Sequence, residues 1–292
     1  MTPVSGPNHG APFPEAVAYA AELIAQADGL VIAAGAGMGV DSGLPDFRGN
    51  GGFWKAYPAL AADGTAFRDI AAPEAFHIDA RQAWGFYGHR LALYRRTVPH
   101  AGYGLLRKWA GATEHGSFVF TSNVDGHFQK AGFSPQSVDE CHGSIHALQC
   151  MQPCCATTWP ATAFVPVVDE ARCALLGSLP ACPYCGGIAR PHILMFNDSA
   201  WIADRHDRQA LRLQTWIERL RRPVIIEIGA GINVGTVRDF SRRTVLHHGG
   251  SLVRINPRES DIGTLPGVGI HAHALETLAA IDAFLDSGRA RS

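Results

Sequence analysis

Residues 30–43 read Leu30-Val31-Ile32-Ala33-Ala34-Gly35-Ala36-Gly37-Met38-Gly39-Val40-Asp41-Ser42-Gly43. The apolar first part is typical of a short buried β-strand. The glycines that follow would let the backbone approach the pyrophosphate of a dinucleotide, at the N-terminus of a helix. The usual fingerprint is incomplete, because Val40 stands at its last glycine and no acidic residue ends an obvious second strand about 20 residues later. The stretch favours a nucleotide-binding turn unlike that of an ordinary dehydrogenase, and a structural glycine turn is the alternative.

Short apolar runs and helical patterns alternate along the rest of the chain. Further apolar runs lie at residues 117–121, 224–228 and 251–255. Helical periodicity is found at residues 15–27, 101–110, 206–221 and 274–286. This alternation predicts a mostly parallel sheet that helices cover on both faces. We therefore expect an α/β fold with a Rossmann-like, doubly wound parallel sheet.

Two segments interrupt the alternation. Residues 49–97 are rich in aromatic side chains and helix-like in their second half, whereas residues 150–191 are rich in Cys, Pro and Gly. We expect this helical insertion and this cysteine-rich module to pack together as a smaller domain. The larger, discontinuous nucleotide-binding domain would then comprise residues 15–48, 98–149 and 192–286.

Composition narrows the class of partner. Of the 292 residues, 47% are hydrophobic and 17% are charged, which indicates packed domains and excludes a mainly disordered chain. The 25 Lys plus Arg balance the 26 Asp plus Glu, so the net charge of -1 gives no global attraction to nucleic acid or anionic membranes. No apolar run approaches the roughly 18 residues of a membrane span, and residues 1–14 lack the pattern of a signal peptide. We expect a cytoplasmic protein with a small-molecule or protein substrate and no nucleic-acid or membrane partner.

The seven cysteines are an odd number and all lie within residues 141–185. That distribution favours a metal site in a reducing compartment over a disulfide framework. Two pairs have the spacing of zinc ligands, namely Cys150, Cys154, Cys182 and Cys185. Four thiolates around a tetrahedral ion make a closed structural site, which would fold its own module without doing chemistry. Cys155 is the alternative to Cys154, and a redox Cys-x-x-Cys pair is the alternative to zinc.

Six segments, in order along the chain, resemble the motifs of the sirtuins, the NAD-dependent protein deacylases. They are Gly-Leu-Pro-Asp-Phe-Arg at 43–48, Thr-Ser-Asn-Val-Asp-Gly at 121–126, Cys-His-Gly-Ser at 141–144, Ile-Leu-Met-Phe-Asn-Asp at 193–198, Gly-Ala-Gly-Ile-Asn-Val at 229–234 and Ile-Asn-Pro at 255–257. The zinc cysteines fall between the third and fourth segments, and Cys154 matches the family position better than Cys155. The resemblance extends over residues 15–286.

The resemblance implies a reaction and a catalytic site. In sirtuins, NAD loses nicotinamide, the acyl-lysine oxygen attacks the ribose C1′, and a histidine activates a ribose hydroxyl that captures the acyl group. His142 would be that general base, with an ordinary pKa of about 6.5 that suits proton transfer at neutral pH. Asp125 would accept from the nicotinamide carboxamide, and Asn123 would order the ribose or a water beside it. Without the resemblance, His142 is one of 14 histidines, and Asn123 and Asp125 could equally form a plain turn.

The resemblance also implies the contacts to NAD. They are Gly35, Ala36, Gly37, Asp46, Phe47, Arg48, Ser122, Asn123, Asp125, Gly229, Ala230, Gly231 and Asn256. Phe47 would cover the nicotinamide pocket, and Arg48 would meet a phosphate with paired donors. The chain departs from the pattern with Gly39 for a family Ser, with Ser122 for a Gln, and with Ala-Gly at 230–231 for Thr-Ser. Backbone amides would have to replace the hydroxyl contacts at 230–231.

On the substrate side, Phe196 and Asn197 would line the peptide groove. Asn197 and Asp198 replace a family Gly and Glu, so that a side chain at position 197 would narrow the groove. Tyr87 and Arg90 have a Tyr-x-x-Arg spacing that is similar to the one that binds acidic acyl groups in desuccinylating sirtuins. The alternative is a surface arginine beside a packed tyrosine.

These observations predict an NAD-dependent protein lysine deacylase, either a deacetylase or a desuccinylase. It would use NAD as co-substrate, hold one structural zinc ion, act on an acyl-lysine protein or peptide, and release nicotinamide and O-acyl-ADP-ribose. One alternative is an NAD glycohydrolase or ADP-ribosyltransferase, which needs no peptide groove and is favoured by Asn197. A second alternative is a non-enzymatic NAD sensor, favoured by the missing hydroxyl contacts. The oligomeric state is not predicted.

Overall fold

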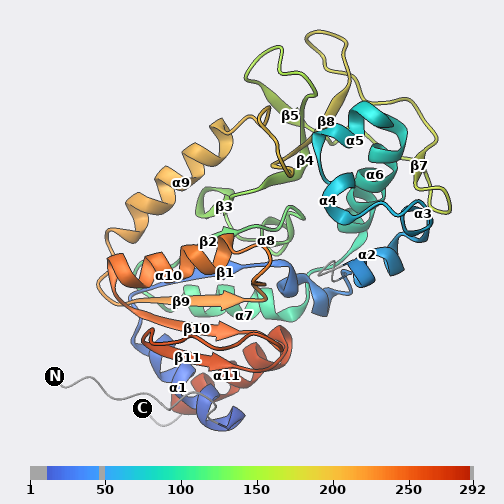
Figure 1. Ribbon diagram of the computed structural model, residues 1–292. Helices are drawn as coiled ribbons and strands as arrows, with labels where there is room; N and C mark the ends of the chain where they lie inside the picture. The colour runs from blue at the N-terminus through green and yellow to red at the C-terminus, as the bar shows by residue number, and fades with distance from the viewer. Residues whose placement is uncertain (1–11, 46–49, 290–292) are drawn as a thin grey trace.

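The computed structural model describes residues 12–45 and 50–289, and its larger part is built on a six-stranded sheet (Figure 1). The strands are β1 (Gly29–Ala34), β2 (Ser117–Thr121), β3 (Val138–Glu140), β9 (Pro223–Ile228), β10 (Ser251–Ile255) and β11 (Gly267–Ile270). They lie in the order β11-β10-β9-β1-β2-β3, and every neighbouring pair is parallel. The strand order reverses at β1, and doubly wound sheets bind ligands at such a switch point, outside the carboxyl ends of the strands. The expected α/β fold is confirmed.

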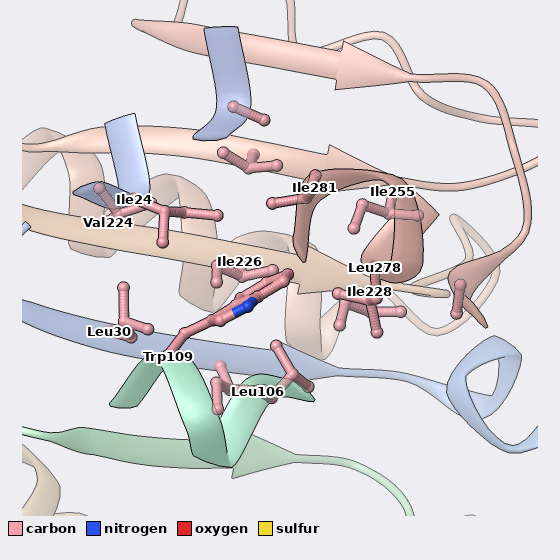
Figure 2. Close-up of a cluster of buried hydrophobic side chains, with 14 of the residues drawn as sticks. Ile24, Leu30, Leu106, Trp109, Val224, Ile226, Ile228, Ile255, Leu278 and Ile281 are labelled. Atoms are coloured by element: carbon pink, nitrogen blue, oxygen red, sulfur yellow. The ribbon is translucent and has the colours of Figure 1, made fainter. Parts of the chain in front are cut away.

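Helices cover both faces of this sheet. They are α1 (Phe13–Gln26), α7 (Ala101–Ala110), α9 (Asp204–Ile217), α10 (Thr236–His248) and α11 (Ala274–Arg289). Helices α1, α7 and α11 share one buried cluster with Leu30 and Ile32 of β1, in which Trp109 is central (Figure 2). Helices α9 and α10 share another cluster with Val31 and Ala33. Because successive side chains of β1 are buried on opposite faces, the strand is apolar throughout.

The second part of the molecule contains the two interrupting segments (Figure 1). Its helices are α2 (Asn50–Ala56), α3 (Pro58–Ala62), α4 (Phe67–Ile70), α5 (Pro73–Ile78) and α6 (Ala80–Arg96). Its strands are β4 (Gly143–Cys150), β5 (Thr158–Pro160), β6 (Val168–Asp169), β7 (Ala174–Leu175) and β8 (Ala189–Ile193). Strands β5-β4-β8 form an antiparallel sheet, and β6 pairs with β7. Trp84 and Tyr87 of α6 lie in one hydrophobic core with Leu148 and Leu175, so the two insertions share a core.

The remaining elements of the described chain are short. They are the 3₁₀ turns η1 (Ala36–Ser42) and η2 (Pro135–Ser137) and the one-turn helix α8 (His127–Lys130). The turn η1 stands directly after β1, where the sequence predicted a ligand-facing helix N-terminus. Within the described residues, no helix is both long and apolar enough to cross a membrane.

Candidate active site

The glycines after β1 bring two loops into backbone contact at the switch point. Gly35 N donates to Ile228 O (2.9 Å), and Gly37 N donates to Gly229 O (3.0 Å). A Cβ at Gly35 would lie 2.7 Å from Gly229 O, and one at Gly229 would lie 2.4 Å from Gly37 Cα. Gly229 also has a φ of 62°, which favours glycine. The loops after β1 and β9 are therefore fixed against each other at the edge where a ligand would bind.

A cavity of about 280 Å³ opens beside these two loops. It is lined by Gly37, Val40, Gly229, Ile255, Pro257, Arg258, His273 and Ala274. Among the described residues expected to contact NAD, Gly37 and Gly229 line it directly. Asn256 stands between the lining residues Ile255 and Pro257 and is fully buried; its Nδ2 donates to Ala230 O (2.8 Å), and its Oδ1 accepts from two backbone N–H groups (3.0 Å each). Asn256 therefore shapes the wall of the cavity.

The other residues that are expected to contact NAD differ in how exposed they are. Ala36 is exposed and Gly231 is half-buried, whereas Ala230 is buried. Asp46, Phe47 and Arg48 lie outside the described residues, so their expected contacts stay predictions.

The segment after β2 is hydrogen-bonded to the end of β1 and to the glycine turn, at the same edge of the sheet. Ser122 N donates to Ala34 O (3.2 Å), and Asn123 Nδ2 donates to Gly35 O (3.0 Å). Asp125 is buried, and its Oδ1 accepts from the backbone N–H two residues further on (2.8 Å). The structure thus brings the segment of Asn123 and Asp125 next to the glycine turn.

His142 lies between β3 and β4 and is half-buried. Its backbone O accepts from Leu194 N (2.9 Å), which joins it to the segment that follows β8. Gly143 has a φ of 78°, and a Cβ there would lie 2.2 Å from His192 O. A glycine is therefore required after His142, because β8 passes too close for any side chain.

The surroundings of His142 favour its neutral imidazole. Burial lowers the pKa of His142, and the nearby His206 lowers this pKa further, while a hydrogen bond to the Ser122 backbone opposes them. His206 carries positive charge more readily than an ordinary histidine, because its hydrogen bond to Asp139 raises its pKa. A neutral imidazole has a free lone pair at neutral pH, as a proton acceptor requires.

Two polar pairs that sequence reasoning missed hold α9 against the end of β3. His206 Nδ1 lies 2.8 Å from Asp139 Oδ1, and Arg205 pairs with Glu140. Both acidic side chains are almost completely buried. The sequence signal for these pairs is that two acidic residues, Asp139 and Glu140, stand shortly before His142. Their partners lie far away in the chain.

The segment after β8 borders a second cavity, of about 530 Å³. The cavity is lined by Arg68, Asp69, Ala72, Glu74, Ala75, Ile78, Phe196 and Asn197. Phe196 N donates to Ala71 O (3.0 Å), and the Arg68 guanidinium lies 4.8 Å from the centre of the Phe196 ring. Asn197 has a φ of 55°, a left-handed conformation that glycine adopts freely and asparagine tolerates. Asparagine can therefore keep the backbone turn of a glycine at this position, and its side chain borders an open cavity.

Tyr87 and Arg90 both lie on α6, with the Arg90 guanidinium 6.0 Å from the centre of the Tyr87 ring. Tyr87 is fully buried and stacks on Phe76, with ring centres 5.8 Å apart. Arg90 donates from Nε and Nη2 to Tyr94 Oη (3.0 and 2.8 Å). Tyr94 stands one helical turn after Arg90, a spacing that could have identified it in the sequence. Burial is the main cause that raises the pKa of Tyr94, and the negative charge of Asp125 also raises this pKa. The group formed by Tyr87, Arg90 and Tyr94 therefore lies near the Asp125 segment.

Four cysteines converge at the end of β4 and in the loop before β8. The sulfur atoms of Cys150, Cys154, Cys182 and Cys185 all lie within 4.8 Å of one another. Cys155 stands outside this group, and Cys141 and Cys173 are buried in separate hydrophobic clusters. Four clustered thiolates without a carboxylate or an open position are the donor set of a structural zinc site.

The parallel sheet, the glycine-bound switch point and the attached four-cysteine module define a Rossmann-like α/β protein with a metal-stabilised insertion. The chain belongs to the Sir2 family, whose model matches residues 35–221. It is 28% identical over 260 residues to the NAD-dependent protein deacylase of Thermococcus kodakarensis, covering 89% of this chain and 92% of that protein. NAD-dependent protein deacylase 1 of Pseudomonas aeruginosa is 30% identical over 240 residues, covering 81% and 86%. A crystal structure of a Sir2 homologue in complex with NAD is 25% identical and has a TM-score of 0.71 over 92% of this chain and 93% of that one.

Proposed function

We propose that the protein is an NAD-dependent protein lysine deacylase that releases nicotinamide and O-acyl-ADP-ribose. One arrangement supports this proposal most. The half-buried imidazole of His142 has a hydrogen bond to the Ser122 backbone beside the glycine turn. The backbone O of His142 accepts from Leu194 N, and Leu194 stands two residues before Phe196, which lines the second cavity. A proton acceptor thus connects the two candidate binding regions. The relatives that are named NAD-dependent protein deacylases and the homologue solved with NAD add support.

Each residue then has a defined task. NAD would lie against residues 35–37 and Gly229, and it supplies the ribose carbon that the acyl-lysine oxygen attacks as nicotinamide leaves. Asn123 and Asp125 would hold the nicotinamide end of the co-substrate. His142 would accept a ribose hydroxyl proton on its imidazole, so that the hydroxyl oxygen can capture the acyl carbon.

The zinc module of the small domain would support this chemistry without taking part in it. We propose that residues 49–97 and 150–191 form that domain, and that residues 15–48, 98–149 and 192–286 form the nucleotide-binding domain. The four clustered cysteines would hold one structural zinc ion. A cytoplasmic location stays a prediction.

The pH dependence of deacylation follows from the lowered pKa of His142. Because the neutral imidazole is the active form and its pKa lies below the ordinary value, activity persists as pH falls and is lost only on protonation. We expect the acid limb of kcat/KM to have its midpoint below about 6.5. The measurement is kcat/KM for an acyl-lysine peptide across the pH range in which the fold is stable. A midpoint above that of free histidine would contradict this assignment of His142.

Arg90 is expected to select acidic acyl groups. A guanidinium already oriented by Tyr94 can bind a carboxylate through two hydrogen bonds. Arg90→Met should therefore lower kcat/KM for a succinyl-lysine peptide about tenfold to hundredfold and that for an acetyl-lysine peptide less than about threefold. Arg96→Met, an exposed change on the same helix, is the matched control. An unchanged ratio between the two peptides would remove Arg90 from the acyl pocket.

The rate of nicotinamide release distinguishes deacylation from its alternatives. With NAD and purified protein, we expect release to depend on added acyl-lysine peptide. Equal release without peptide would indicate an NAD glycohydrolase, and no release under either condition would indicate a sensor. For the deacylase, and against the glycohydrolase, Asn197 lines a cavity of about 530 Å³ and has a left-handed backbone conformation that asparagine tolerates.

A further inference from the structure

A buried ion pair joins β8 to the segment that follows it. Arg190 and Asp198 have completely buried side chains, and their contacts measure 2.7 Å from Nη1 to Oδ2 and 2.8 Å from Nη2 to Oδ1. Arg190 Nη1 also donates to Ile193 O (3.2 Å), and Asp198 Oδ2 accepts from Met195 N (3.3 Å). These bonds close residues 193–198 into what we call the clipped turn.

The clipped turn lies between His142 and the helical insertion. Leu194 N donates to His142 O (2.9 Å), and Phe196 N donates to Ala71 O (3.0 Å). Asn197 takes a left-handed conformation at its end and lines the second cavity. The orientation of the turn therefore sets the position of one wall of that cavity relative to His142.

Stability alone does not explain a charged pair at this place. Arg190 Nε is buried without a hydrogen-bond partner among the described residues, so the pair leaves one donor unsatisfied. Buried ion pairs can often be replaced by apolar side chains of similar volume without a loss of stability. A guanidinium and a carboxylate that meet through two parallel contacts do, however, fix both the distance and the angle between their backbones. The pair is therefore suited to holding the clipped turn in one orientation relative to β8.

We propose that Arg190 and Asp198 are positioning residues that hold the clipped turn against His142 and thereby orient the acyl-lysine substrate. They act through the backbone of Leu194 and Phe196, which carries the bonds to the neighbouring elements. The last step, substrate orientation, rests on the proposed deacylase function. The positioning of the turn itself does not depend on it.

Hydrogen exchange tests the positioning directly. In the double variant Arg190→Met, Asp198→Asn, both positions are neutral, so no unpaired charge is buried, and the amide oxygen introduced at position 198 can still accept from Met195 N. We expect amide exchange in residues 192–199 to become at least about tenfold faster, while β9 keeps its protection. Arg190→Lys keeps the charge but loses the planar fork, and it should also speed exchange there. Unchanged protection of residues 192–199 in the double variant would overturn the proposal.

Kinetics test the consequence for the substrate. We expect the double variant to raise KM for the acyl-lysine peptide about tenfold and KM for NAD less than about twofold. Lys108→Met, which removes an exposed ion pair with Asp282 and Asp286, is the control and should change neither constant. An equal rise in both constants would show general damage and contradict substrate positioning. If the parent protein turns over no acyl-peptide, the proposed function fails, whereas the exchange experiment still decides the role of the pair.

Discussion

Replacing His142 with alanine is expected to lower peptide deacylation about a hundredfold to ten-thousandfold, the usual contribution of a general base. The imidazole is half-buried and burial lowers its pKa, which favours the neutral form, so the variant removes the side chain proposed to accept the proton. Steady-state kcat with saturating NAD and peptide measures the loss.

The control for this variant is His247→Ala, which changes an exposed histidine at the end of α10. We expect it to retain the parent kcat. The thermal midpoint of His142→Ala should stay close to that of the parent, since the side chain is only half-buried. A kcat within about threefold of the parent would exclude His142 as the base.

Loss of the zinc site is expected to have the largest effect on folding. Structural zinc contributes on the order of 10 kcal/mol to the folding of small modules, and here the module shares its core with the helical insertion. Cys182→Ser should therefore lose bound zinc, expose residues 150–191 to proteolysis and abolish deacylation. Zinc content, limited proteolysis and thermal unfolding measure the three effects.

Cys154 and Cys155 provide a matched comparison. Cys154 belongs to the group of four sulfur atoms, whereas its neighbour stands outside it. Cys154→Ser should lose the metal, and Cys155→Ser should keep one zinc ion per chain. The reverse result would assign the ligand to Cys155.

The central strands could be predicted from the sequence because they are buried on both faces. The apolar runs at 30–34, 117–121, 224–228 and 251–255 correspond to β1, β2, β9 and β10. Helix α10 was not anticipated, because two positions of its buried face are Ser241 and Thr244. Their hydroxyls bond to carbonyls one turn earlier, at Val237 and Phe240, which satisfies them inside the core. A periodicity based on apolar residues misses such a helix.

The candidate site could be predicted only where its residues are local in sequence. The four-cysteine group follows from spacing, and its convergence is confirmed. The pair of Asp139 with His206 and that of Arg190 with Asp198 depend on how α9 and the clipped turn fold back onto β3 and β8. No local sequence pattern predicts how these segments pack. Position 197 shows the same limit, because the sequence predicted only that a side chain there narrows the groove, whereas the left-handed backbone is one that asparagine tolerates.

Mass spectrometry of the products tests the proposed deacylation most directly. Purified protein would be incubated with NAD and with an acetyl- or succinyl-lysine peptide, with the His142→Ala variant in parallel. We predict that O-acyl-ADP-ribose appears together with nicotinamide and the free-lysine peptide, and that the variant fails to form it. ADP-ribose and nicotinamide in equal amounts with and without peptide, and no acylated product, would contradict the account.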